Sequence, residues 1–145
     1  VNYRAKLWSR FDAAPVLRDL ASRADLVFAG PDEAALFVGD EEPLAGLARL
    51  GPAEVVVKDG ARGCTALIEG SRYALPAPAV TVVDPVGAGD AFVAGYLADR
   101  MAGAPPEARL RTAIAVGAFS VTVPGDCEGL PRREDLAAGG DDVTR

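Results

Sequence analysis

The chain has 145 residues, half of them hydrophobic and a quarter charged, which is the composition of a globular protein of one domain. The net charge of -6 offers no basic face for nucleic acid, and no apolar stretch approaches the ~20 residues that cross a bilayer. There is no histidine, and Cys64 and Cys127 lack the spacing of a zinc site. We therefore expect a single cytoplasmic domain over residues 1–145, without a leader or membrane span and with reduced cysteines.

The first half of the chain alternates helical and extended patterns. Apolar residues recur at helical spacing after an opening loop, and β-branched runs bounded by turn residues indicate buried strands. Pro31 stands where a helix tolerates proline, and Gly39 ends that helix. The expected elements are helices over residues 13–24, 31–38 and 43–50, and strands over residues 25–29 and 54–58.

The second half begins with a hairpin signal, Glu69-Gly70-Ser71, and continues into long helices rich in small residues. Alternating strands and helices favour an α/β fold with a mainly parallel sheet, helices on both faces and one small antiparallel hairpin. The expected elements here are strands over residues 64–68, 72–75 and 80–83, and helices over residues 88–101 and 105–121.

A glycine-rich segment, residues 84–92 (DPVGAGDAF), joins a strand end to the start of a long helix. The free N–H groups and the positive dipole at a helix start attract anions, and Gly87 and Gly89 let phosphate oxygens approach the backbone. Asp90 would then lie beside a phosphoryl group, where a carboxylate can accept the proton of an attacking hydroxyl. Taken alone, the segment equally fits a tight turn followed by a helix-capping acid. Dinucleotide-binding and Walker-type loops fit worse, because Phe92 replaces a small residue and no Gly-Lys-Ser/Thr sequence occurs.

Residues 84–92 closely resemble the C-terminal signature of ribokinase-like (PfkB-type) carbohydrate kinases. The resemblance implies a ribokinase-like fold with Asp90 as the catalytic base. It also implies that the backbone amides of Gly87, Ala88 and Gly89 hold the γ-phosphate of ATP as an anion hole. In relatives the position of Asp84 lies near a monovalent-cation site, which suggests K⁺, and a turn carboxylate is the equal alternative.

The resemblance extends over nearly the whole chain. Residues 57–64 resemble the family's strand and glycine turn beside the nucleotide, and the implied nucleotide-binding residues there are Lys58, Gly60, Arg62 and Gly63. Lysine and arginine can neutralise phosphate charge, although a Lys-Asp-Gly turn by itself is more often a plain hairpin. The helix at 113–122 resembles the segment beside the adenine, and it also fits a core helix.

Glu33 corresponds to the acidic residue of the family's Asn-x-x-Glu motif, which organises Mg²⁺ and phosphate through water. This chain has Gly30 where the family has asparagine, which puts the motif in doubt but leaves an outer-sphere role for Glu33. The alternative, equally open, is an acid in the first turn of a helix.

Two segments resemble 2-keto-3-deoxygluconate kinases in particular: residues 2–9, with Arg4, and residues 125–131, with Asp126. The planar guanidinium of Arg4 would suit the carboxylate of a sugar acid, and Asp126 could accept hydrogen bonds from sugar hydroxyls. A surface cation and a loop turn residue are the alternative interpretations.

Members of the family are longer, so the chain resembles their nucleotide-binding and catalytic C-terminal half. If these 145 residues are the whole polypeptide, an uncovered strand edge and sugar pocket predict a partner chain, an oligomer or loss of activity. One hypothesis is an enzyme that uses ATP and Mg²⁺ to phosphorylate 2-keto-3-deoxygluconate or another sugar, with fructokinase, ribokinase and adenosine kinase activities open. The other is a non-catalytic, nucleotide-binding or structural remnant.

Overall fold

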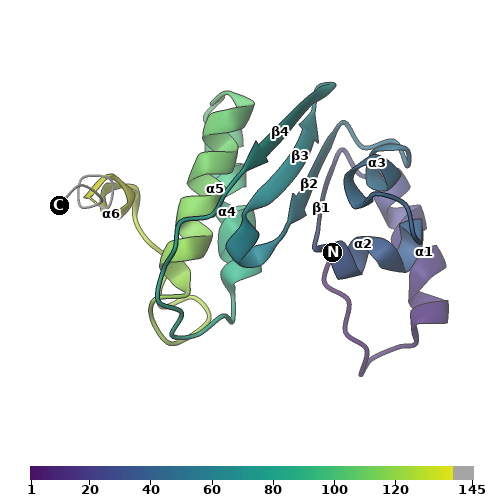
Figure 1. Ribbon diagram of the computed structural model, residues 1–145, viewed down its shortest axis with the longest axis horizontal. Coiled ribbons are helices and arrows are strands. Elements are labelled where there is room, and N and C mark those ends of the chain that lie inside the picture. The colour runs from purple at the N-terminus through teal and green to yellow at the C-terminus, as the bar shows by residue number, and fades with distance from the viewer. Residues whose placement is uncertain (139–145) are drawn as a thin grey trace. The chain divides into compact units, whose positions relative to one another are not determined.

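The computed structural model describes residues 1–138, apart from the side chain of Phe37. The chain forms two compact units, Val1–Leu75 and a second that begins at Pro76 (Figure 1). No helix in the described part of the chain is long and apolar enough to cross a membrane.

The first unit contains three helices, a 3₁₀ turn and all the strands of the described chain. Its elements are α1 (Arg10–Ser22), β1 (Leu26–Ala29), α2 (Pro31–Val38), α3 (Pro43–Ala48), β2 (Glu54–Lys58), η1 (Gly60–Arg62), β3 (Cys64–Ile68) and β4 (Ser71–Leu75). The sequence placed the start of the first helix too late, because Ser9 caps it: the Ser9 hydroxyl oxygen accepts a hydrogen bond from the Asp12 amide at 3.2 Å.

The four strands form one sheet in the order β1-β2-β3-β4. Only β1 and β2 are parallel; β2 with β3 and β3 with β4 are antiparallel. The expected hairpin is therefore present, but the sheet is mixed and not mainly parallel. Two helices separate β1 from β2, whereas short turns follow β2 and β3, and short turns can join only antiparallel neighbours.

One face of the sheet packs against the helices of the same unit. Alternate residues of β1 and β2, among them Val27 and Val55, face a buried cluster supplied by α1, α2 and α3. The buried members from the helices are Ala21, Ala34, Val38, Leu44 and Leu47. This packing fixes the carboxyl ends of the parallel strands β1 and β2 at one edge of the sheet, where Gly30 and Asp59 follow them.

The second unit consists of helices α4 (Ala88–Met101), α5 (Pro106–Ser120) and α6 (Arg133–Ala138), joined by loops. A Cβ atom on Gly95 would lie 2.9 Å from Val116 Cγ2 and 3.1 Å from Ala113 Cα, so α4 and α5 approach as closely as glycine allows. The contact explains why this helix pair is rich in small residues.

The strand expected over residues 80–83 is not formed. At its end, the Val83 amide and the following Asp84 amide both donate hydrogen bonds to Val121 O, at 2.7 and 3.2 Å. Val80, Val82 and Val83 are all exposed, so this stretch has no buried face to pack against a neighbouring strand. A valine-rich stretch therefore does not by itself form a strand.

Candidate functional site

The glycine-rich turn leads directly into α4. Gly87 precedes the helix with φ 76° and ψ -12°, and the amide of Ala91 donates to Gly87 O at 2.8 Å. The amides of Gly89 and Asp90 therefore lie before this first helical bond, in the position where a helix start can bind an anion. Asp90, in the first turn of α4, is exposed, so its carboxylate is open to solvent.

Asp84 joins the glycine-rich turn to a second loop of the same unit. Its Oδ1 accepts a hydrogen bond from the Val86 amide at 3.0 Å, and its Oδ2 accepts one from the Gly125 amide at 3.2 Å. These two backbone donors, that of Val86 first, lower the pKa of Asp84. Asp84 thus has the contacts of a turn carboxylate, and each oxygen keeps a further lone pair.

Asp126 lies against the glycine-rich turn. A Cβ atom on Gly87 would be 2.3 Å from Asp126 O and 2.4 Å from Asp126 Oδ1, so no other residue fits at Gly87 without displacing this loop. The positive φ of Gly87 also favours glycine. The structure therefore brings four predicted residues of the second unit together: Asp84, Gly87, Asp90 and Asp126 share the start of α4 and the loop packed on it.

The loop that carries Asp126 is stabilised from within. Glu128 Oε2 accepts a hydrogen bond from the Cys127 amide at 3.1 Å. Backbone N–H groups of Glu128 itself, of Cys127 and of Asp126 lower the pKa of the Glu128 carboxyl, in that order of importance. Sequence reasoning did not assign Glu128, and no spacing rule would have identified a carboxylate that binds the backbone of its own loop.

In the first unit, the turn after β2 holds the residues predicted to bind nucleotide. Arg62 donates from Nε and Nη2 to the two carboxylate oxygens of Asp59, both at 2.6 Å, and this side-chain hydrogen bonding raises the pKa of Arg62. Gly63 closes the turn, since Gly63 O accepts from the Asp59 amide at 2.8 Å. Arg62 is thus partly neutralised by Asp59, a residue that the sequence prediction left out although it lies three positions before the arginine.

Glu33 caps α2 and also fastens the N-terminal segment. Its Oε2 accepts from the Gly30 amide at 2.9 Å and its Oε1 from the Tyr3 amide at 3.2 Å. A Cβ atom on Gly30 would lie 3.7 Å from Glu33 Oε2 and 3.9 Å from Lys58 O, which are ordinary contacts. Glu33, Gly30 and Lys58 therefore lie together at the carboxyl edge of the parallel strands, with room for a larger residue at Gly30.

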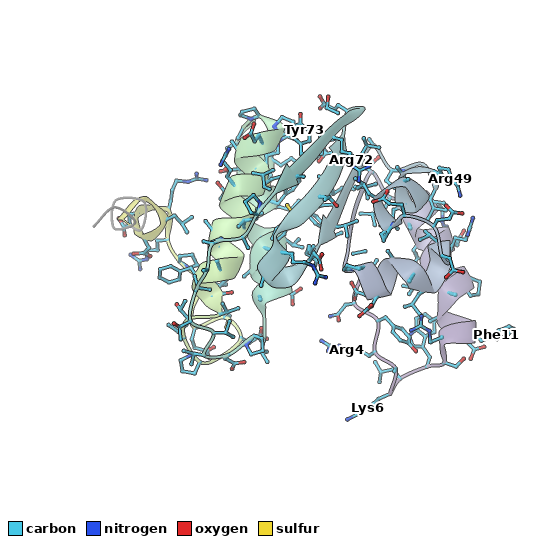
Figure 2. The ribbon with its side chains drawn as sticks, viewed as in Figure 1. Arg4, Lys6, Phe11, Arg49, Arg72 and Tyr73 are labelled. Carbon is cyan, nitrogen blue, oxygen red and sulfur yellow. The ribbon has the colours of Figure 1, made fainter. Side chains whose placement is uncertain are left out.

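Arg4 follows Tyr3 in that segment and is exposed. Figure 2 shows Arg4 and Lys6 extending outward from the segment. The loop is held by the Tyr3 hydroxyl, which donates to Trp8 O at 3.1 Å, and by the Leu7 amide, which donates to Arg4 O at 2.9 Å. The guanidinium is thus free to meet an anion, while its backbone is fixed.

Within residues 1–138, no three histidine, cysteine or acidic side chains converge to hold a metal ion directly. The role expected for Glu33 acts through water and needs no such cluster. A nucleotide-bound Mg²⁺ would take most of its oxygen ligands from phosphates and water.

The sequence and the fold both resemble those of known proteins. The profile of pfkB family carbohydrate kinase matches residues 1–133. A fructokinase of Klebsiella pneumoniae is 34% identical, covering 93% of this chain and 48% of the fructokinase. A 2-dehydro-3-deoxygluconokinase of Bacillus subtilis (strain 168) is 35% identical, covering 94% of this chain and 44% of that protein.

A solved structure shares the fold. It is a double mutant of the fructokinase of Vibrio cholerae O395, bound to fructose, ADP and potassium ion, with a TM-score of 0.83 and 27% identity, covering 94% of this chain and 47% of that chain. The present chain spans about half the length of the curated relatives it matches.

Proposed function

This chain belongs to the pfkB family of carbohydrate kinases, and from this premise we propose that its protein transfers the γ-phosphate of ATP to a hydroxyl of a sugar or sugar acid. The ribokinase-like fold expected from the sequence is confirmed, since a solved structure of a putative ribokinase II from E. coli matches 94% of this chain with a TM-score of 0.82 and 29% identity. The observation that carries the proposal is the exposed carboxylate of Asp90, which lies in the first turn of α4, directly after the Gly87–Gly89 turn.

In this mechanism Asp90 accepts the proton of the acceptor hydroxyl while that oxygen attacks the γ-phosphorus. The new O–P bond forms as the bond to the β,γ-bridging oxygen breaks, and ADP leaves. The amides of Gly87, Ala88 and Gly89 donate to the phosphoryl oxygens on which charge develops. The helix start fixes this turn before transfer, and the Ala88 amide, which donates to Pro85 O at 3.4 Å, would exchange that long bond for one to phosphate.

The nucleotide contacts are assigned to the turn after β2. The residues that would lie along the phosphates are Lys58, Gly60, Arg62 and Gly63. When phosphate binds, the Arg62 guanidinium would either leave Asp59 or donate to Asp59 and phosphate together. Glu33 would orient water around Mg²⁺, which supplies neutralisation of phosphate charge when bound. Asp84 is assigned to a K⁺ site, which the potassium-bound relative supports. Use of ATP and reduced cysteines suits a cytoplasmic enzyme.

For the acceptor we propose 2-keto-3-deoxygluconate, the same compound as 2-dehydro-3-deoxygluconate. Arg4 would pair with its carboxylate and Asp126 would accept hydrogen bonds from its hydroxyls. The Bacillus subtilis relative supports this substrate. The similarity to the Klebsiella pneumoniae fructokinase favours fructose as the second candidate, for which Arg4 would have no partner.

The decisive variant is Asp90→Asn in the intact protein. It removes the base but keeps the size of the side chain, so we expect kcat to fall by about 10²–10⁴-fold with the affinity for ATP little changed. Product ADP is measured with 2-keto-3-deoxygluconate, fructose and ribose as acceptors. Asp32→Asn is the matched control, because Asp32 is also an exposed acid in the first turn of a helix.

Equal turnover by the Asp90→Asn and wild-type proteins would overturn the assignment of the base. ATP binding by the wild-type protein without transfer to any acceptor would favour the non-catalytic alternative. A clear preference for fructose would move the substrate assignment from the sugar acid to the neutral sugar.

A further inference from the structure

A buried carboxylate outside the proposed site joins the three helices of the second unit. Asp99, near the end of α4, is 5% exposed. Its Oδ2 accepts a hydrogen bond from Thr112 Oγ1 at 2.6 Å, and its Oδ1 accepts one from Arg133 Nη2 at 2.7 Å. Thr112 belongs to α5 and Arg133 begins α6, so the carboxylate is the point where the three helices meet.

A carboxylate taken out of water is costly unless donors satisfy it. The Thr112 hydroxyl satisfies only one oxygen and carries no charge, whereas Arg133 brings both a donor and a positive charge. Release of Arg133 would leave a buried anion without its counter-charge. The pKa of Asp99 is lowered first by the Thr112 hydrogen bond and then by the hydrogen bond and charge of Arg133. The Arg133 side chain is itself 70% exposed, so the pair joins a buried anion to a cation at the surface.

Arg133 ends the segment that carries Asp126. This segment, residues 121–133, which we call the 121–133 loop, forms no helix or strand before α6. At its start Val121 O accepts from Val83 N and Asp84 N, and in its middle the Gly125 amide donates to Asp84 Oδ2. The bond between Arg133 and Asp99 fastens its far end.

We propose that the Asp99–Arg133 ion pair is a positioning device of the phosphoryl-transfer site, which keeps the 121–133 loop closed so that Asp126 stays against Gly87. The proposal rests on the proposed function, in which Asp126 contacts the acceptor. Neither Asp99 nor Arg133 touches the reacting atoms; both act through the loop.

The first test needs no activity. Amide hydrogen exchange of residues 125–128 is compared between the wild-type protein and Arg133→Met, and we expect about tenfold faster exchange in the variant, because loss of a charge-assisted bond favours local opening. Arg133→Lys should restore part of the protection, since lysine keeps the charge and a donor. Unchanged exchange in Arg133→Met would overturn the proposal, whatever the enzyme does.

Two control variants separate this effect from general destabilisation. Arg111→Met removes an arginine that pairs with Glu107 on the surface of α5, and it should leave loop exchange unchanged. Thr112→Val removes the other hydrogen bond of Asp99, so it should weaken the contact between α4 and α5. Amide exchange of residues 125–128 should nevertheless be slower in Thr112→Val than in Arg133→Met. Equal loop exchange in Thr112→Val and Arg133→Met would show a merely structural role and overturn the proposal.

The second test is kinetic and uses the intact protein. In Arg133→Met we expect KM for the sugar acceptor to rise about tenfold, while kcat and KM for ATP change little, because the loop contacts the acceptor and not the nucleotide. Faster loop exchange with an unchanged acceptor KM would overturn the positioning role. Asp90→Asn should show the opposite pattern, with kcat lost and loop exchange preserved, so failure of the proposed function is distinguished from failure of this inference.

Discussion

Gly87 and Gly103 have nearly the same backbone conformation in different surroundings. Their φ angles are 76° and 75°. A Cβ atom on Gly103 would meet nothing within 4 Å, whereas one on Gly87 would lie 2.3 Å from Asp126 O. The pair therefore separates the cost of a left-handed backbone from the cost of displacing the loop.

We predict that Gly103→Ala lowers the free energy of unfolding by about 1 kcal/mol, the cost of a side chain at positive φ. Gly87→Ala should lower it by about 2–4 kcal/mol, because overpacking against Asp126 is added to the same backbone cost. Urea denaturation measures both values. Equal losses in the two variants would mean that Asp126 does not lie against Gly87 in solution.

Gly30 lies where the resemblance to the family predicts asparagine, and the structure leaves room there. Its φ of -79° suits any residue, and its Cβ contacts would be ordinary. We predict that Gly30→Asn keeps or raises the free energy of unfolding by a few tenths of a kcal/mol, because asparagine is a better helix N-cap than glycine. A loss above about 1 kcal/mol in urea denaturation would contradict this expectation, since a loss of that size is normal only where a side chain lacks room.

The sequence could place Glu33 in the first turn of a helix, but it could not predict that Glu33 also binds the amide of Tyr3. The two residues are 30 positions apart, and only the folded chain brings them together. The Arg62–Asp59 ion pair could have been predicted from the sequence, because residues three apart in a tight turn are neighbours. Local spacing thus predicts partners within a turn, while contacts between distant segments require the fold.

Among the elements, α4 was predicted with its observed bounds, Ala88–Met101. A glycine turn, an acid in the first turn and a long run of helix-forming residues act locally and in the same direction. The stretch over residues 80–83 shows the limit of such reasoning, because a strand needs a neighbour and a β-branched run does not supply one. The short helix α6 was missed: it has six residues and little periodicity.

The contact between α4 and α5 depends on Gly95. Alanine at this position would stabilise the helix by about 1 kcal/mol relative to glycine. Its Cβ, however, would lie only 2.9–3.1 Å from Val116 Cγ2, Ala113 Cα and Thr112 O. Two of these three atoms are backbone and cannot rotate away. We predict that Gly95→Ala lowers the free energy of unfolding by about 1–3 kcal/mol, because overpacking outweighs propensity.

Gly117→Ala provides the comparison on the facing helix, where the nearest atom to a new Cβ would be Ala88 O at 3.3 Å. Its loss should be smaller than that of Gly95→Ala in the same thermal or urea unfolding experiment. A larger loss at Gly117 would show that the helices are not packed most closely at Gly95.

At the scale of the whole molecule, family membership followed from a short segment, because residues 84–92 combine a glycine turn and a helix start in one local motif. The sheet was harder to predict, since strand direction depends on the length of each connection and on which strands become neighbours. The expectation of one domain over residues 1–145 stays a prediction, and the two cysteines offer a test of it.

Cys64 lies in the first unit and Cys127 in the second, with opposite environments. Cys64 is buried in β3, and burial raises its pKa to about 11, whereas Cys127 is exposed. Because the thiolate is the reactive form, a disulfide reagent at pH 8 should label Cys127 rapidly and Cys64 only after its strand unfolds. In a Cys127→Ser variant, labelling of Cys64 therefore reports the unfolding of the first unit alone.

We predict that Cys64 becomes reactive at the same urea concentration at which the helical circular dichroism signal is lost. The described part of the second unit has three helices and no strand, and a helix pair of that size is marginal by itself. Its helices should therefore not outlast the sheet of the first unit. Helical signal that persists after Cys64 has become reactive would belong to α4 and α5, because α1–α3 lie in the unit whose unfolding Cys64 reports, and the chain would then be two domains.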